Sequence, residues 1–217
     1  MSIRSISRAA LLPFLVLVTS TAVRADVIVS DFEGGTEGWQ LSGDSSTATP
    51  DHIASDGNPG AFIRGFDTAV GGVWYFAAPA KFLGNRSTSY GGTLQYSLRQ
   101  RGSGSIFNSQ DIIIDGAGLT LRLVNTPPIP SSSTWTQYVA TLDETDPWTL
   151  ASGGNPTQAE FQSVMADLQS LRIRGEFIVG SDNGDLDSVS MTAVPEPSHL
   201  GVLAFTCVLL RWRRAKR

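Results

Sequence analysis

The sequence predicts an all-β fold, an antiparallel β-sandwich that carries one short helix. About nine segments are short and rich in β-branched and aromatic residues, and Gly, Asn, Asp, Ser or Pro separates them. Many short strands joined by such turns are typical of sandwiches. One segment, near 157–170, has instead the periodicity of an amphipathic helix.

Residues 1–25 have the layout of a secretory signal peptide. Arg4 and Arg8 precede the apolar stretch Ala9–Val18, and the small residues of "TAVRA" follow. A charged region, an apolar region and a small-residue site in this order predict cleavage after Ala25. The apolar stretch is shorter than the roughly 20 residues of a membrane span. We therefore expect an exported protein.

The strand segments of the body show where the core should lie. "LTLRLVN" and "LRIRGEF" alternate apolar and polar residues, which gives a strand one buried and one wet face. We expect Leu171 and Ile173 to face the core. Arg172, Arg174 and Glu176 then face the other side. The expected strands are 26–33, 60–67, 72–79, 91–100, 110–116, 119–125, 135–143, 171–180 and 185–192, and the expected loops are 43–60, 100–110, 125–134 and 151–156.

The helix is predicted by its first turn and by its apolar stripe. Thr157 followed three residues later by Glu160 forms a capping box. The residues of the stripe have the spacing of one helical face, and they are Phe161, Val164, Met165 and Leu168. We expect this helix to pack on the sandwich.

The charge of the body limits its partners. Residues 26–192 hold 19 acidic and 8 basic residues, a net charge of −11, whereas the whole chain carries −4. Such a surface repels phosphate backbones, so we expect no nucleic-acid partner. The one cysteine, Cys207, lies outside the body, so the mature domain should contain no disulfide.

Residues 193–217 predict a weak membrane anchor. The apolar run Leu200–Leu210 would be about 16 Å long as a helix, at roughly 1.5 Å per residue, against a bilayer core of about 30 Å. A basic cluster follows the run and should stay in the cytoplasm, and its members are Arg211, Arg213, Arg214, Lys216 and Arg217. We expect transient anchoring in the inner membrane, with a plain single-pass tail anchor as the alternative.

The same segment begins with a distinctive triplet, Pro195, Glu196 and Pro197. The triplet, the short apolar helix and the terminal arginines resemble the PEP-CTERM sorting signal of Gram-negative bacteria. The resemblance implies that an exosortase-type enzyme recognises the triplet, removes the tail and delivers the protein to the cell surface or the extracellular matrix.

A second resemblance covers the body. "GGVWYFAAPAKFLGNRSTSYGGTLQYSLRQ", "DIIIDGAGLTL", "WTQYVATLDE", "TQAEFQSVMADLQSLRIRGEF" and "LDSVSM" follow one another in the order of a laminin IV (laminin B) domain. The match covers about 70–192, and with "DFEGGTEGWQL" 31–192. It implies a jelly-roll, galactose-binding-like β-sandwich at 26–192, a place in the extracellular matrix and no established catalysis.

Enzymatic motifs are scarce in the body. His52 is its one histidine, and no Gly-x-Ser-x-Gly elbow is present. A glycosidase needs two acids near an aromatic platform, and Asp143, Glu144 and Asp146 precede Trp148. An exposed acidic turn is the other interpretation of these neighbours.

Acids near the ends of the body suggest a structural calcium ion. Ca²⁺ takes about six to eight oxygen ligands, many of them from carboxylates. Jelly-roll sandwiches of the carbohydrate-binding type often join their first and last strands and bind calcium there, so we expect a site by analogy. Its candidate ligands are Asp31, Glu33, Asp56 and Asp187. The alternative is that these acids cap turns and accept hydrogen bonds from their own backbone.

We expect a non-catalytic surface or matrix protein that binds exopolysaccharide or another matrix component. Two alternatives remain open. One is a glycosidase or polysaccharide lyase acting on matrix glycan. The other is a structural biofilm-matrix protein without a discrete ligand. A cleft with two close carboxylates would favour the enzyme, and a shallow aromatic strip would favour the sugar binder.

Overall fold

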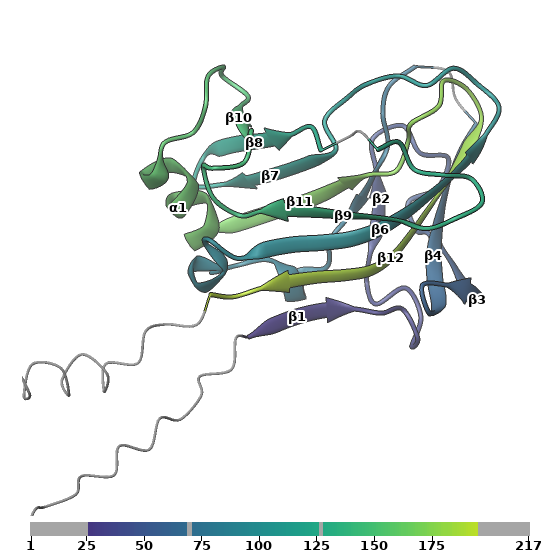
Figure 1. The fold of residues 1–217 in the computed structure, drawn as a ribbon, viewed down its shortest axis with the longest axis horizontal. Helices are drawn as coiled ribbons and strands as arrows, with labels where there is room; N and C mark the ends of the chain where they lie inside the picture. Colours follow the sequence, from purple (N-terminus) through teal and green to yellow (C-terminus); the bar gives the residue numbers. More distant parts are fainter. Residues whose placement is uncertain (1–25, 69–70, 126–127, 195–217) are drawn as a thin grey trace, which may run out of the picture. The chain divides into compact units, whose positions relative to one another are not determined.

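The computed structural model describes residues 26–68, 71–125 and 128–194, which belong to one compact unit. Two antiparallel sheets face each other across the core, which confirms the expected β-sandwich (Figure 1). The first sheet has the order β3–β4–β12–β6–β9, and β1 also pairs with β12. Its strands are β1 (Val27–Ser30), β3 (Asp51–Gly57), β4 (Gly60–Asp67), β6 (Thr93–Gly102), β9 (Thr136–Thr141) and β12 (Asp182–Thr192).

The second sheet has the order β10–β8–β7–β11–β5–β2. Its strands are β2 (Gln40–Ser42), β5 (Tyr75–Ala77), β7 (Ile112–Gly116), β8 (Leu119–Leu123), β10 (Thr149–Leu150) and β11 (Leu168–Arg174). Two 3₁₀ turns, η1 (Ala80–Phe82) and η2 (Ser87–Ser89), lead from β5 into β6, and the helix α1 (Gln158–Ala166) precedes β11.

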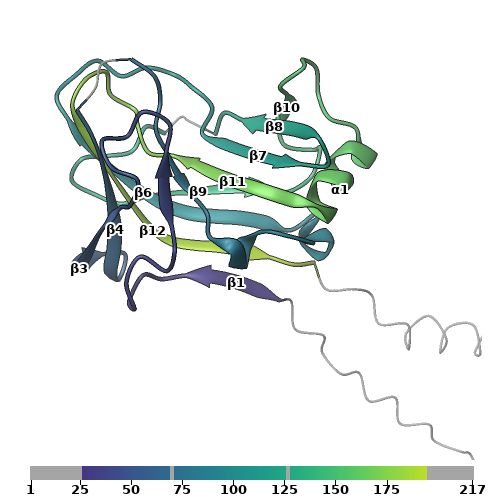
Figure 2. The same cartoon turned by 180° about the vertical axis from the view of Figure 1, so that it is seen from behind.

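The long strand β12 joins the two ends of the domain. One edge of β12 pairs with β6, and the other edge pairs first with β4 and then with β1. Val27 lies opposite Thr192, and Ser30 lies opposite Val189. The first and last strands therefore lie side by side, as Figures 1 and 2 show.

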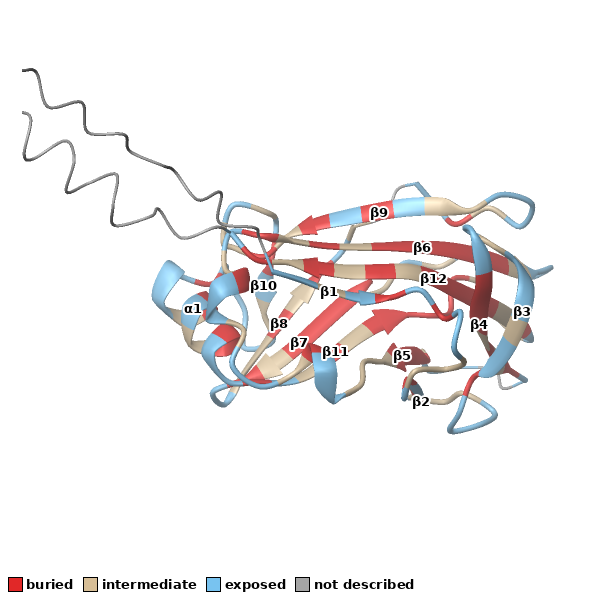
Figure 3. Cartoon of the chain, turned by 90° about the horizontal axis from the view of Figure 1, so that it is seen from below, coloured by how far each residue is buried: buried red, intermediate tan, exposed pale blue. Residues whose placement is uncertain are grey.

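The core between the sheets is built around large aromatic side chains. Trp39, Trp74 and Trp148 are all fully buried. The Trp74 ring lies against Gly175 so closely that a Cβ atom at that position would overlap it. Glycine at this point lets the ring fill the space between the sheets. In Figure 3 the buried residues follow β6, β12, β7 and β11, whereas β3 is mostly exposed and α1 has both buried and exposed residues.

The helix has the expected first turn but ends earlier than expected. The Thr157 hydroxyl accepts a hydrogen bond from the Glu160 N–H, and the Glu160 carboxylate accepts one from the Thr157 N–H, so the capping box is confirmed. Phe161, Val164 and Met165 are buried. The helix ends at Ala166 rather than near 170, because Leu168 already belongs to β11.

Two other expectations need correction. The segment 43–60, expected as a loop, contains the strand β3, whose polar residues gave no alternation because both of its faces are largely exposed. The outward face of β11 is not exposed to solvent at the C-terminal end of the strand. Arg174 is fully buried, with Nη1 donating to Asp111 Oδ1 at 3.2 Å, and Glu176 just beyond the strand is 2% exposed.

Candidate functional site

A row of charged side chains crosses the outer face of the first sheet. Ile63, Leu98 and Leu186 point into the core, so their neighbours along each strand point outward. The strand register places Asp185 of β12 between Arg64 of β4 and Arg99 of β6. An outward row of opposite charges on three adjacent strands follows from this pairing.

The row is tightly paired. Arg64 donates through Nε to Asp185 Oδ1 at 2.6 Å and through Nη2 to Oδ2 at 3.0 Å. Arg99 donates through Nε to Asp185 Oδ2 at 2.9 Å. Asp185 is fully buried and Arg99 is 4% exposed. These charge-assisted hydrogen bonds hold both guanidinium groups in place.

Aromatic rings complete this surface. The Arg99 guanidinium lies 4.5 Å from the ring centre of Trp135 and 5.1 Å from that of Phe62. The two rings meet edge to face at 5.3 Å. Trp135 remains partly exposed, and its Nε1 donates to the Asp56 carbonyl oxygen at 3.2 Å. The indole is thus held by stacking on one side and by a hydrogen bond at its edge.

The exposed rim of the surface is polar. Asp56 Oδ2 accepts from Arg99 Nη1 at 2.9 Å, and the Asp56 side chain is 72% exposed. Arg101 is 41% exposed and reaches Asp56 and Asp185 only at 3.6 Å. We call the set Phe62, Arg64, Arg99, Arg101 and Trp135, with Asp56 and Asp185, the Trp135 surface. It combines a fixed aromatic ring with nearby hydrogen-bonding groups.

The sequence prediction did not identify this surface. The alternation in "GAFIRGFD" places Phe62 and Arg64 on the same face of their strand, and the alternation in "LQYSLRQRG" places Arg99 and Arg101 on the same face of theirs. That signal could have found each pair. The pairing of β4 and β6 through β12 was needed to bring the pairs together.

Three of the four predicted calcium ligands share one region. Asp187 is fully buried, and its Oδ1 accepts from the Ser188 N–H at 2.6 Å while its Oδ2 accepts from the Asn58 N–H. The pKa of Asp187 is raised to about 6, mainly by burial and also by the negative charges of Glu33 and Asp31, while the hydrogen bonds from the Asn58 and Ser188 N–H groups lower it.

The other predicted ligands also accept hydrogen bonds from protein groups. Glu33 Oε1 accepts from the Ala61 N–H at 3.0 Å, and Asp31 Oδ1 accepts from the Glu33 N–H at 3.2 Å. Asp56 lies in the Trp135 surface, in its ion pair with Arg99. Calcium binding between β1 and β12 stays a prediction.

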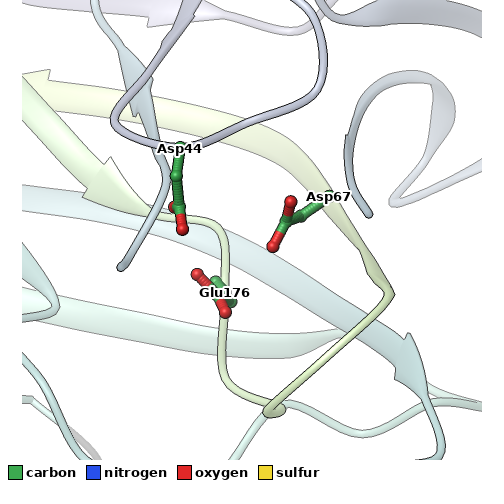
Figure 4. Close-up of side chains that lie close together, drawn as sticks. All are labelled: Asp44, Asp67 and Glu176. Atoms are coloured by element: carbon green, nitrogen blue, oxygen red, sulfur yellow. The ribbon is translucent and has the colours of Figure 1, made fainter. Parts of the chain in front are cut away.

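A second group of acids was not expected. Asp44 follows β2, Asp67 ends β4, and Glu176 follows β11. One carboxylate oxygen of each lies within 4.8 Å of the others, and the three side chains point toward one another (Figure 4). Oxygens at this spacing could touch one cation. An acidic cluster alone does not identify a metal site, and we assign none here.

Two members of the cluster, Glu176 and Asp44, retain their protons more strongly than ordinary acids. Burial, together with the charges of Asp44 and Asp182, raises the pKa of Glu176 to about 7, although the Trp74 N–H donates to its Oε2 at 3.2 Å. Burial also raises the pKa of Asp182 to about 6 and that of Asp44. Part of the Glu176 population is therefore protonated at neutral pH.

Of the acids considered for glycosidase chemistry, Asp143 and Asp146 accept hydrogen bonds from backbone N–H groups in or beside their own turn, and Glu144 Oε2 accepts one from the Tyr90 hydroxyl. Asp143 Oδ1 accepts from the Thr145 N–H at 2.8 Å, and Asp146 Oδ2 accepts from the Thr141 N–H at 2.5 Å. Trp148 is fully buried, so it offers no sugar platform. These contacts favour the interpretation as an acidic turn.

The predicted sorting residues Pro195, Glu196 and Pro197 lie outside the described residues. Within the described part of the chain, no helix is long and apolar enough to cross a membrane.

The family model "Laminin B (Domain IV)" matches residues 75–204. Laminin subunit gamma-1 of Xenopus tropicalis is 32% identical over 174 residues, which cover 79% of this chain and 10% of that protein. The chain thus corresponds to about a tenth of this relative.

Two solved structures share the fold. The L4b domain of human laminin alpha-2 superposes with a TM-score of 0.61 at 15% identity, covering 77% of this chain and 97% of that one. A family 11 carbohydrate-binding module from Clostridium thermocellum, solved with a β-1,3-1,4-mixed-linked tetrasaccharide, gives 0.52 at 13% identity, covering 82% and 100%. At these identities the likeness concerns the fold alone.

Proposed function

The chain belongs to the laminin B (domain IV) family, and from this premise we propose that it is an exported, non-catalytic matrix protein that binds glycan through the Trp135 surface. The observation that carries the proposal is Trp135 itself, a partly exposed indole held in place by Arg99 and by the Asp56 carbonyl. The proposed ligand is exopolysaccharide or another glycan of the extracellular matrix.

The chemistry of the surface suits a sugar. The C–H face of a pyranose ring packs on an indole, and its hydroxyl groups need donors and acceptors beside the ring. Arg101 supplies exposed donors and Asp56 supplies exposed acceptors. Because Arg99 already fixes the indole, binding a sugar costs little side-chain ordering.

The competing enzymatic function has less support. A glycosidase or polysaccharide lyase would need catalytic acids beside the bound sugar. Asp143 and Asp146 are held in their own turn, and Asp185 is paired with two arginines. A matrix protein without a discrete ligand is the remaining alternative, and a binding experiment separates it from our proposal.

The proposal is tested by screening the full-length protein on a glycan array. Our expectation is selective binding of one class of polysaccharide, weakened in Trp135→Ala and weakened less in Trp135→Phe, which keeps an aromatic ring. Circular dichroism must show that both variants are folded, because Trp135 covers Phe62 and Arg99. Binding by folded Trp135→Ala equal to that of the parent would argue against this site.

We also propose that residues 193–217 sort the protein. In this proposal an exosortase-type enzyme recognises Pro195, Glu196 and Pro197 after transient inner-membrane anchoring, and releases the domain to the surface of a Gram-negative cell. Replacing the triplet with alanines should leave an uncut precursor in the membrane fraction, visible as a larger band on an immunoblot. Normal trimming of that variant would contradict the sorting proposal.

A structural calcium ion between β1 and β12 is a further part of the proposal. Supporting it, the pKa of the Asp187 carboxylate is raised by burial and by the charges of Glu33 and Asp31, and a divalent cation would offset this repulsion. Asp56 would have to leave its ion pair with Arg99 to join such a site, so the proposed carboxylate ligands are Asp31, Glu33 and Asp187.

A further inference from the structure

A hollow of about 390 Å³ lies between η2 and α1. Its lining residues are Ser87, Tyr90, Gln162, Ser163 and Ala166. We propose that this hollow is a second glycan subsite, which takes a neutral sugar residue. The inference extends the proposed function but does not use the Trp135 surface.

The lining has the chemistry that a neutral sugar needs. Tyr90 offers an aromatic ring and Ala166 a methyl group, whereas Ser87, Gln162 and Ser163 offer groups that can both donate and accept hydrogen bonds. None of the five side chains is charged. A hollow with one ring and several hydroxyl or amide groups matches a polyhydroxylated ring better than an ionic ligand.

The hollow is held in shape by its surroundings. The Tyr90 hydroxyl donates to Glu144 Oε2 at 2.6 Å, and its ring packs edge to face on buried Phe161 with 6.2 Å between ring centres. Ser163 Oγ donates to the Glu160 carbonyl at 2.7 Å, so its lone pairs can accept from a ligand hydroxyl. Burial and the neighbouring Glu144 raise the pKa of Tyr90 to about 12, which keeps its hydroxyl protonated.

The hollow and the Trp135 surface lie at opposite ends of β6. The turn η2 directly precedes β6, which starts at Thr93, whereas Arg99 and Arg101 lie near the end of that strand (Figure 1). Six residues of strand separate Thr93 from Arg99, which is roughly 20 Å at about 3.3 Å per residue. Two sites this far apart make the domain bivalent, so it can join two glycan chains or two distant parts of one chain.

The experiment uses the full-length protein and five probes: D-glucose, D-galactose, D-mannose, N-acetyl-D-glucosamine and the charged D-glucuronate. Binding is measured by isothermal titration calorimetry and by saturation-transfer NMR. We expect at least one neutral sugar to bind with a dissociation constant of about 1 mM, as a ligand of this size allows. Failure of all four neutral sugars to bind, or binding of glucuronate alone, would overturn the proposal.

Two alanines on α1 give a matched pair of variants. Ala166→Phe should fill the hollow and weaken binding by at least about tenfold. Ala159→Phe places the same side chain at another exposed position of the helix outside the lining and should change affinity less than about twofold. Unchanged binding in Ala166→Phe would refute the site.

The variant Trp135→Ala separates this inference from the proposed function. If it abolishes monosaccharide binding while Ala166→Phe does not, the hollow is refuted and the Trp135 surface stands. If Ala166→Phe abolishes monosaccharide binding while Trp135→Ala leaves both monosaccharide and polysaccharide binding intact, the hollow stands and the Trp135 surface is refuted.

Discussion

Replacing Glu176 with glutamine should stabilise the protein above neutral pH and leave it nearly unchanged in acid. The pKa of Glu176 is raised from 4.5 to about 7 in the folded protein, because the carboxyl is buried beside Asp44, Asp182 and Asp67. The folded state therefore binds this proton more tightly than the unfolded state. The stabilisation is complete below about pH 4.5 and is lost as the pH rises through about 7.

The size of the effect follows from that change in pKa. Each tenfold change in proton affinity corresponds to about 1.4 kcal/mol, so raising the pKa from 4.5 to about 7 costs the ionised folded state about 3 kcal/mol at pH 8. Glu176→Gln keeps an oxygen that can accept from the Trp74 N–H but carries no charge. The variant should be more stable at pH 8 by up to about 3 kcal/mol, or about 6–12 °C in melting temperature.

The assay is guanidinium unfolding followed by tryptophan fluorescence at pH 4.5 and pH 8, with EDTA present to remove cations. Asp51→Asn is the control, since it removes the charge of an exposed acid in β3. The parent and the control should lose stability between the two pH values, and Glu176→Gln should lose about 3 kcal/mol less, the remaining loss coming from Asp182 and Asp187. An equal loss in Glu176→Gln and the parent would refute the reasoning.

Three further predictions concern other parts of the fold. Calcium at 100 times its dissociation constant should stabilise the protein by about 2.7 kcal/mol, or about 5–10 °C in melting temperature, and Asp187→Ala should abolish the difference between the calcium and EDTA melting curves. Identical calcium and EDTA curves for the parent protein would rule out the calcium site. Arg174→Met should lower the free energy of unfolding by about 3–5 kcal/mol because it breaks the buried ion pair with Asp111, and adding Asp111→Asn should recover part of the loss. An Arg174→Met protein as stable as the parent would contradict this. Gly175→Ala should lower stability by about 1–3 kcal/mol because its Cβ would overlap the buried Trp74 indole, whereas Gly34→Ala, with open space around it, should be nearly neutral. Equal melting temperatures for the two variants would count against the packing of Trp74 on Gly175.

Features set by neighbouring residues were predicted well from the sequence. The capping box needs only Thr157 and Glu160 three residues apart, and the core side of β11 needs only the alternation of Leu171 and Ile173. The remainder of the predicted β-sandwich depends on the resemblance to the laminin IV domain. This includes strands that are too short to be predicted from their own alternation of apolar and polar residues.

Features set by the pairing of distant strands were not predicted. The sequence predicts a loop where β3 lies, because an exposed edge strand tolerates the polar residues of "DHIASDG". Asp44, Asp67 and Glu176 lie on three different elements, and their convergence depends on the order of strands in both sheets. The same holds for the Trp135 surface, whose members come from five separate segments of the chain.

The most direct test of the account is the ratio of two dissociation constants, those of Trp135→Ala and of the parent protein, for the polysaccharide that the glycan array identifies. Stacking of one sugar on an aromatic ring is worth roughly 1–2 kcal/mol, by analogy with aromatic contacts elsewhere, so folded Trp135→Ala should bind about 5–30 times more weakly. Trp135→Phe should fall between the two. A ratio of about one, with both proteins folded, would contradict the claim that this domain holds its glycan on the outer face of the first sheet.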